Sequence, residues 1–537
     1  MRMSERIRSY HDMNRRVVAM GLAVLVLSCL LPPGAGCGIA TKEPYTGRVI
    51  ALDTPFKVLA IRVPSFPQRS FDIRDYGAAG DGNAMNTKAF AAAIAACAQA
   101  GGGRVLVPAG TWLTGPIHLK SNINLHLEKD AGIRFSANFE DYLPVVFTRY
   151  EGLECYNYSP LIYARDCTNV AVSGEGKLDG QGKPWWQARE KYKSGAQRLY
   201  NMASGAVPVK DRVFGTTDYF LRPSFIQFVN CKNVLVEGLT VGSGPMWIIH
   251  PVYCENVIVR NVTLINNGPN NDGIDPDSCR NVLIEYCNFD TNDDAVAIKS
   301  GRDADGWRVG RPCENIIVRH CRFGLGSHCD GVVSIGSEMS GDVRNVFIHD
   351  CTFDRTERAV RIKSKRGRGG VVENIWLEDI TIGEIDSDPL LLNMFYGSGV
   401  SSSSKATPKF RNIYVKNLTC RKARNAIRIV GLPESSVENV RLENISISSE
   451  NGLSCTDAKG IKLINVNIAP KKGPVIRFKN SRDVIIEKST CAKGTDTFLE
   501  LEGERTTNIH LIDNDLSNAQ RDIVFGRGVR PDVVRCK

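Results

Sequence analysis

Short segments of alternating apolar and polar residues recur along most of the chain. Each segment carries an asparagine, then valine or isoleucine, a variable residue and a second apolar residue, as at 256–259 and 281–284. Neighbouring segments are often 23 to 27 residues apart, as at 233, 256 and 281 and at 412 and 439. Such alternation predicts β-strands, and the gaps are too short for the crossover helices of a doubly wound sheet. The repeated asparagines are Asn169, Asn233, Asn256, Asn281, Asn315, Asn345, Asn374, Asn412 and Asn439.

This repeat predicts an all-β fold, a right-handed parallel β-helix in which each coil stacks on the last at a spacing of ~4.8 Å. The asparagines fit turn positions, because asparagine tolerates left-handed backbone and can bond to its stacked neighbours. An alanine-rich stretch, 87–100, predicts a short helix, with Asn86 or Thr87 as its cap. We expect this helix to cap the N-terminal end of the β-helix, where an open edge would otherwise invite aggregation.

The first 40 residues do not share this pattern. A pair of arginines, Arg15 and Arg16, precedes an apolar run over 17–31, which is short for a membrane span and is typical of a signal peptide. The sequence Gly-Ala-Gly-Cys at 34–37 resembles a bacterial lipoprotein cleavage box, so Cys37 is a candidate for lipid anchoring to a membrane. We therefore expect an exported protein, which is periplasmic, an outer-membrane lipoprotein or secreted. After residues 1–40, we expect a linker at 41–70 and a single β-helical domain at 71–537, with a polar insertion near 182–218 and a flexible excursion at 400–405.

Composition limits the kinds of binding partner and cofactor that we expect. Hydrophobic residues make up 42% of the chain, enough for a long core, and the net charge of +10 is compatible with a solvated basic surface or with attraction to a polyanion. No nucleic-acid-binding motif is present, so we expect no nucleic-acid partner. The 17 cysteines recur at fixed places in the repeat, which predicts stacked, mostly unpaired buried thiols rather than a disulfide framework. Zinc-ligand spacing is absent, and we expect neither a metal nor a cofactor.

Three aspartates stand out as candidate catalytic groups. Asp272 lies 21 residues before Asp293, which is followed by Asp294. This spacing is close to one coil, so the β-helix would bring the three carboxylates together, which is costly without a purpose. In glycoside hydrolysis by inversion, one carboxyl group protonates the leaving oxygen and another activates water, usually ~6.5–9.5 Å apart.

Basic residues follow these acids in the sequence. Arg361 and Lys363 alternate on one strand and would point to the same face, and Lys299 lies on the strand directly after the acid pair. Arginine and lysine suit a sugar carboxylate, so these residues predict binding of an acidic polymer.

At this point the chain resembles the polygalacturonase-type glycoside hydrolases of family 28. Asn270-Asn271-Asp272 is similar to the family's Asn-Thr-Asp motif with one substitution, Asp293-Asp294 to its Asp-Asp pair and 361–363 to its Arg-Ile-Lys motif, within a resemblance over about 71–445. It implies a β-helical enzyme that cleaves α-1,4-galacturonosyl linkages of pectin with inversion. Asp293 would then be the general acid, Asp272 and Asp294 would activate water, and Asn270 would contact substrate.

One family motif, Gly-His-Gly, is missing in that form. The nearest histidine is His328 in 326–331, which we take as a candidate catalytic residue. His250 and Tyr396 are further candidate substrate contacts, the latter by stacking on a sugar ring, whereas Trp247 is better explained by core packing.

Several alternatives remain open. The substrate could be rhamnogalacturonan or xylogalacturonan, and the 182–218 insertion could block one end of a groove and favour exo attack. A calcium-dependent pectate lyase would use the same aspartates as metal ligands. A non-enzymatic adhesin or glycan-binding module would keep its function when Asp293 is replaced by asparagine.

Overall fold

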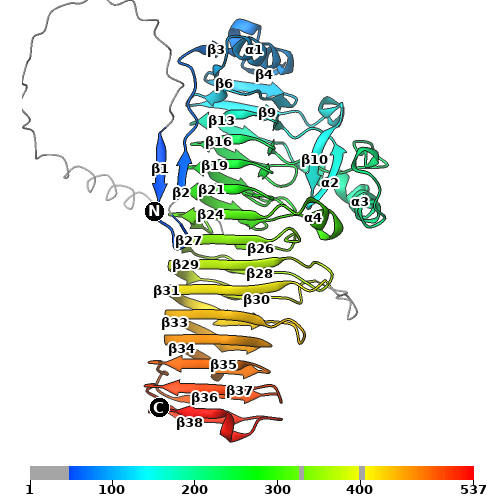
Figure 1. Ribbon diagram of the computed structural model, residues 1–537. Helices are drawn as coiled ribbons and strands as arrows, with labels where there is room; N and C mark the ends of the chain where they lie inside the picture. Colours follow the sequence, from blue (N-terminus) through cyan, green and yellow to red (C-terminus); the bar gives the residue numbers. More distant parts are fainter. Residues whose placement is uncertain (1–47, 58, 326–331, 398–405) are drawn as a thin grey trace, which may run out of the picture. The chain divides into compact units, whose positions relative to one another are not determined.

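Parallel strands stacked coil on coil build the body of the protein, as the repeat predicts (Figure 1). The computed structural model describes residues 48–57, 59–325, 332–397 and 406–537. The signal segment, Cys37, His328 and the excursion at 400–405 lie outside these residues. Among the described residues, no helix combines the length and hydropathy needed to cross a membrane.

The strands form three parallel ladders. The first ladder comprises β3 (Ser70–Asp72), β5 (Gly103–Val107), β8 (Ile123–Leu127), β13 (Thr168–Gly174), β16 (Lys232–Glu237), β19 (Glu255–Arg260), β21 (Arg280–Glu285), β24 (Cys313–Arg319), β27 (Val343–Phe353), β29 (Val371–Glu384), β31 (Lys409–Asn425), β33 (Val437–Thr456), β34 (Ala458–Lys479), β35 (Arg482–Glu487), β37 (Thr507–Ile512) and β39 (Val534–Cys536). The second comprises β4 (Asp81–Met85), β6 (Gly110–Thr114), β9 (Ala131–Phe135), β14 (Lys177–Asp179), β17 (Thr240–Gly242), β20 (Thr263–Asn266), β22 (Asn288–Thr291) and β25 (Arg322–Phe323), and it continues in the later residues of β27 and the long strands after it.

The third ladder carries the site described below. It comprises β7 (Ile117–His118), β12 (Ile162–Arg165), β15 (Ile226–Val229), β18 (Ile249–Val252), β23 (Val296–Ile298), β26 (Val333–Gly336), β28 (Val360–Lys363), β30 (Leu390–Asn393) and β32 (Ile427–Val430), and after the ends of β33 and β34 it reaches β36 (Thr495–Glu502) and β38 (Ala519–Phe525). Between β18 and β23 the ladder continues through bridges at Ile274 and Asp277.

The turn asparagines behave as predicted. Asn281 and Asn315 have φ values of 58° and 59°, and the side-chain amide of Asn315 donates to the side-chain oxygen of Asn281 at 3.0 Å. The same side-chain bond links Asn233 to Asn256 and Asn345 to Asn374. Left-handed backbone and stacking together explain why the repeat needs this residue type.

The capping helix and the free thiols are also confirmed. Helix α1 (Thr87–Gln99) buries Phe90 and Ile94 against the first coils. Every described cysteine is unpaired, and all except Cys536 are buried. The backbone N–H of Cys231 lies 3.4 Å from the sulfur of Cys254, one coil on, so these thiols stack as a ladder.

The predicted linker at 41–70 does not hold for its described part. β1 (Val49–Leu52) and β2 (Leu59–Arg62) form an antiparallel hairpin. The side chains of Leu52 and Ile61 pack on an apolar stripe on the outside of the first ladder, and Phe56 packs against Trp376. The alternating apolar residues of this short segment bury surface that would otherwise face water. The stripe consists of Ala171, Leu235, Ile258, Leu283, Ile317 and Phe347.

Several elements lie outside the ladders, beside the third one (Figure 1). The predicted insertion contains two helices that polar composition alone did not reveal. The elements outside the ladders are the antiparallel hairpin β10 (Val146–Tyr150) and β11 (Leu153–Asn157), and the helices α2 (Lys183–Lys191), α3 (Ser194–Ser204) and α4 (Asp303–Val309), of which α2 and α3 belong to the insertion. Helix α3 contacts both β11 and α4, so these elements form one wall next to the ladder.

Candidate active site

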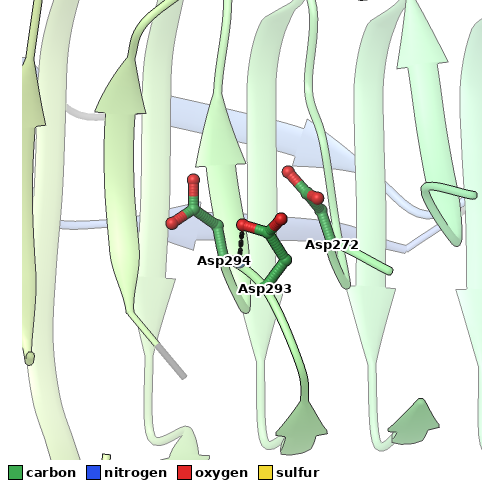
Figure 2. Close-up of side chains that lie close together, drawn as sticks. All are labelled: Asp272, Asp293 and Asp294. Atoms are coloured by element: carbon green, nitrogen blue, oxygen red, sulfur yellow. Dashed lines mark hydrogen bonds between the residues drawn. The ribbon is translucent and has the colours of Figure 1, made fainter. Parts of the chain in front are cut away.

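The three aspartates lie together at one corner of neighbouring coils (Figure 2). The bridge between Ile274 and Val296 places Asp272 and Asp294 at equivalent positions of adjacent coils. A Cβ atom at Gly273 would lie 2.4 Å from the carbonyl oxygen of Ala295, so glycine allows this close approach. The prediction that the repeat stacks these carboxylates is confirmed.

Asp294 is held as a carboxylate by two cations. Its oxygens accept hydrogen bonds from Arg361 and from Lys363, each at 2.6 Å, and from the hydroxyl of Ser334 at 2.7 Å. Burial raises the pKa of Asp294, but Lys363 and Arg361 outweigh it and hold the pKa far below its usual range. Since both cations come from β28, one strand fixes the ionisation of this group.

Asp272 belongs to a buried network around Lys299. The ammonium of Lys299 lies 3.4 Å from Asp272, 3.5 Å from Asp275 and 3.5 Å from Glu338. Burial and the charge of Asp293 raise the pKa of Asp272. Burial also raises the pKa of Glu338, but Lys299 outweighs it and lowers the value to about 2. Lys299 is thus the shared counter-charge of three acids.

Asp293 is the most exposed of the three aspartates. Its Oδ1 accepts the backbone N–H of Asp294 at 2.9 Å, and its Oδ2 lies 3.5 Å from the side-chain amide of Asn270. Burial, and then the charge of Asp294, raise its pKa. Asp293 forms no ion pair with any described cation, so its raised pKa favours the protonated form that a general acid needs.

The pocket has a volume of about 140 Å³. Its walls bring together most of the residues that the sequence indicates and add three more, Glu151, Ser337 and Glu338. The full lining is Glu151, Trp247, Asn270, Asp272, Asp293, Asp294, Lys299, Ser337, Glu338, Lys363 and Tyr396. Arg361 reaches it through its bond to Asp294. Tyr396 is 36% exposed and lies with its ring centroid 5.2 Å from the ammonium of Lys363, which leaves an aromatic surface open to a sugar.

His250 is corrected by the structure. It is fully buried, its Nδ1 lies within hydrogen-bonding distance of Ser224 and Gln227, and its Nε2 lies 3.7 Å from Asp277. Its ring packs edge-on against Trp247, with the centroids 4.9 Å apart, and its full burial excludes direct contact with a substrate. Trp247 is also buried, as expected, and the ammonium of Lys299 lies 4.2 Å from its ring centroid.

The carboxylates are closer together than the general spacing for inversion. One oxygen of each aspartate can be chosen so that all three lie within 4.8 Å of one another, against the usual ~6.5–9.5 Å. The usual spacing applies to a pair of carboxyl groups. This site differs because it has a third carboxylate, Asp294, which forms ion pairs with two cations. The same three oxygens are close enough to one another to hold a cation.

A wall formed by β10–β11 and α3 limits the pocket on one side. At the hairpin tip, the carboxylate of Glu151 accepts hydrogen bonds from Tyr200 and from Arg302, the latter at 3.2 Å. A Cβ at Gly152 would lie 2.9 Å from the backbone nitrogen of Arg302, so the tip sits tightly against the coil. No periodicity in the sequence signals these contacts, because Glu151 lies 49 residues from Tyr200 and 151 residues from Arg302, outside the repeat.

Comparison with known proteins identifies the family. Residues 215–469 match the model for glycosyl hydrolases family 28, and residues 70–132 match one described as rhamnogalacturonase A/epimerase, pectate lyase-like. A probable polygalacturonase of Vitis vinifera is 31% identical over 82% of this chain and 85% of its own length.

Solved structures of polygalacturonases are also similar to this chain. A hyperthermoactive exopolygalacturonase from Thermotoga maritima has a TM-score of 0.68 and 44% identity, over 74% of this chain and 89% of that one. A polygalacturonase from Erwinia carotovora ssp. carotovora shares the fold, with a TM-score of 0.57 and 24% identity, over 74% of this chain and 98% of that one. Together with the aspartate cluster, these matches show that the chain belongs to glycosyl hydrolases family 28 and is a glycoside hydrolase.

Proposed function

We propose that this enzyme hydrolyses α-1,4-galacturonosyl linkages of polygalacturonan by acid–base catalysis. The observation that carries the proposal is the single pocket that combines the raised pKa of Asp293 with an ionised Asp294 held by Arg361 and Lys363. A group that keeps its proton next to one that stays ionised is the arrangement that glycosidic cleavage requires. The named substrates of the matched proteins support the same polymer.

In the proposed mechanism, Asp293 donates its proton to the glycosidic oxygen as the bond to the anomeric carbon breaks. Asp272 and Asp294 orient a water molecule and accept its proton as its oxygen bonds to that carbon. Arg361 and Lys363, both on β28, attract the uronate carboxylate while they hold Asp294 ionised. Burial strengthens each of these interactions, because little water screens them.

The test is incubation of the whole protein with polygalacturonate in the presence of either a chelator or added calcium. New reducing ends without ultraviolet absorbance by an unsaturated product, unaffected by the chelator, are expected. Absorbance that requires calcium would overturn hydrolysis and make the aspartates metal ligands of a lyase. Product sizes from the same reactions show whether attack begins at chain ends, and rhamnogalacturonan and xylogalacturonan serve as comparison substrates.

The pH dependence of kcat/KM should be bell-shaped. Asp272 and Asp293 both have raised pKa values, and their closeness means that they titrate as a pair. The active form carries one proton on this pair, so activity is lost as pH rises and the last proton leaves, and again as pH falls and both become protonated. Measurement between about pH 3 and 9 should place the alkaline limb above the ordinary pKa range of a carboxyl group. An alkaline limb within that range would contradict the assignment of Asp293.

Inversion predicts the anomer of the product. Attack by water opposite the leaving group converts an α-linkage into a new β reducing end, whereas a covalent intermediate would give the α-anomer. Proton NMR in the first seconds after enzyme addition, before mutarotation, should show the β-anomer. Initial α-anomer would mean that one of the closely spaced aspartates is a nucleophile.

We also infer that the chain is exported and that Cys37 anchors it to a membrane through a lipid. The apolar run at 17–31 and the Gly-Ala-Gly-Cys sequence support this. Radiolabelled fatty acid should enter the protein expressed in a bacterium and should not enter Cys37→Ser. Export of the wild-type protein without label would contradict anchoring.

A further inference from the structure

A second cavity, of about 320 Å³, adjoins the catalytic pocket. Glu151 lines both, so the hairpin tip between β10 and β11 stands at their boundary. The second cavity is walled by that tip, by α2 and α3, and by residues 220–222. It is more than twice as large as the catalytic pocket, and none of the residues assigned above to catalysis or substrate binding lines it.

Arg222 is the unusual residue in this cavity. It is 1% exposed, and its guanidinium donates to the carbonyl oxygens of Pro245 and Pro269, at 2.9 and 2.5 Å, and to Asn270 Oδ1 at 2.8 Å. Its Nε has no hydrogen-bond partner, and within the described part of the chain it forms no ion pair. A buried guanidinium satisfied only by neutral oxygens is costly, because buried charges are normally paired.

Nearby acidic groups are engaged elsewhere. Glu151 bonds to Tyr200 and Arg302, and Glu190 on the rim pairs with Arg189 and Lys193. Burial raises the pKa of Tyr150, next to Arg222, to about 12, so this phenol stays neutral. The cavity therefore holds a buried positive charge whose counter-charge the described protein does not supply.

We propose that Arg222 binds the carboxylate of the galacturonate unit next to the one in the catalytic pocket, and that the second cavity holds that sugar. This proposal rests on the proposed function. Its geometry is continuous with the catalytic centre, since Arg222 bonds to Asn270 and Asn270 contacts Asp293. A uronate would complete the charge balance of Arg222 through charge-assisted hydrogen bonds, whereas a neutral sugar would leave the guanidinium unpaired.

Calorimetric titration of the Asp293→Asn protein with digalacturonate and with its dimethyl ester tests this proposal. Adding Arg222→Met should weaken binding of the acid about 10- to 100-fold, and by about 10-fold more than binding of the ester. The matched control is Arg198→Ala, an exposed arginine on α3 outside the lining of both cavities, which should change both affinities by less than about threefold. An equal loss for acid and ester would indicate that Arg222 only positions Asn270, and it would overturn the proposal.

A crystal structure of the Asp293→Asn protein with digalacturonate provides the second test and does not depend on how Arg222→Met folds. A uronate carboxylate in ion-pair contact with Arg222 is expected. A ligand in the catalytic pocket with only solvent beside Arg222 would overturn this assignment. Hydrolysis of polygalacturonate by the wild-type protein separates the two proposals, because its absence would contradict the proposed function itself.

Discussion

Replacing Asp293 by asparagine is expected to lower kcat/KM on polygalacturonate on the order of 10³-fold while leaving the fold intact. The asparagine cannot donate a proton to the leaving oxygen, and general acid catalysis contributes about 10²- to 10⁴-fold. Stability should be maintained, because burial and Asp294 disfavour the ionised form of Asp293 in the wild-type protein. Reducing-end assays and thermal unfolding monitored by circular dichroism measure the two effects.

The matched control is Asp290→Asn on β22, three residues earlier and outside the pocket lining. It should keep wild-type activity. A folded Asp293→Asn protein that turns over polygalacturonate normally would remove Asp293 from the mechanism and revive a binding-module interpretation of the fold.

Replacing Lys299 by methionine should have the largest effect on stability, a loss of about 3–5 kcal/mol in the free energy of unfolding at neutral pH. Lys299 is 3% exposed and is the cation shared by Asp272, Asp275 and Glu338. Its removal leaves buried Asp272 and Asp275 without their ion-pair partner and leaves Glu338 with only the charges of Arg368 and Arg302, which raises the pKa values of the three acids in the folded protein. Urea denaturation followed by fluorescence measures the loss.

The pH dependence of this variant has a definite sign. Groups whose pKa is raised on folding bind more protons in the folded state, so stability increases as pH falls toward their ordinary values. The difference between Lys299→Met and wild type should therefore shrink between about pH 7 and 4.5. An exposed lysine on the first ladder, Lys416, provides the control, since Lys416→Met should change stability by less than about 1 kcal/mol. A difference independent of pH would mean that packing, rather than charge, explains the loss.

Local repetition explains how much the sequence could predict. The asparagine spacing predicted the coil, and the coil placed Asp272 beside Asp294 without any knowledge of the site. The alternation at 361–363 then predicted that Arg361 and Lys363 share one face of a strand, and both bond to Asp294. These predictions succeed because a solenoid converts sequence separation directly into spatial neighbourhood.

Residues outside the repeat were beyond such reasoning. Arg222 lies in the segment just before β15 and Glu151 at a hairpin tip, and their contacts depend on how these segments fold back on the coils. The assignment of His250 to substrate contact is wrong because a polar residue near a catalytic motif can face inward, where Ser224 and Gln227 lie within hydrogen-bonding distance of its Nδ1. Asp275 and Glu338 carried no separate signal, since their importance arises from the one lysine that they share.

The β1–β2 hairpin changes how the array should come apart. In a stack where each coil touches only its neighbours, unfolding can fray inward from either end. β2 contacts β19 and β21, Phe56 packs on Trp376 of β29, and the hairpin shares one apolar cluster with residues of β13, β16, β24 and β27. It therefore ties coils that are not neighbours into one cooperative block. Hydrogen exchange should therefore distinguish two regions, with the coils after β31 opening first. The catalytic corner, between β18 and β28, lies inside the block that opens last.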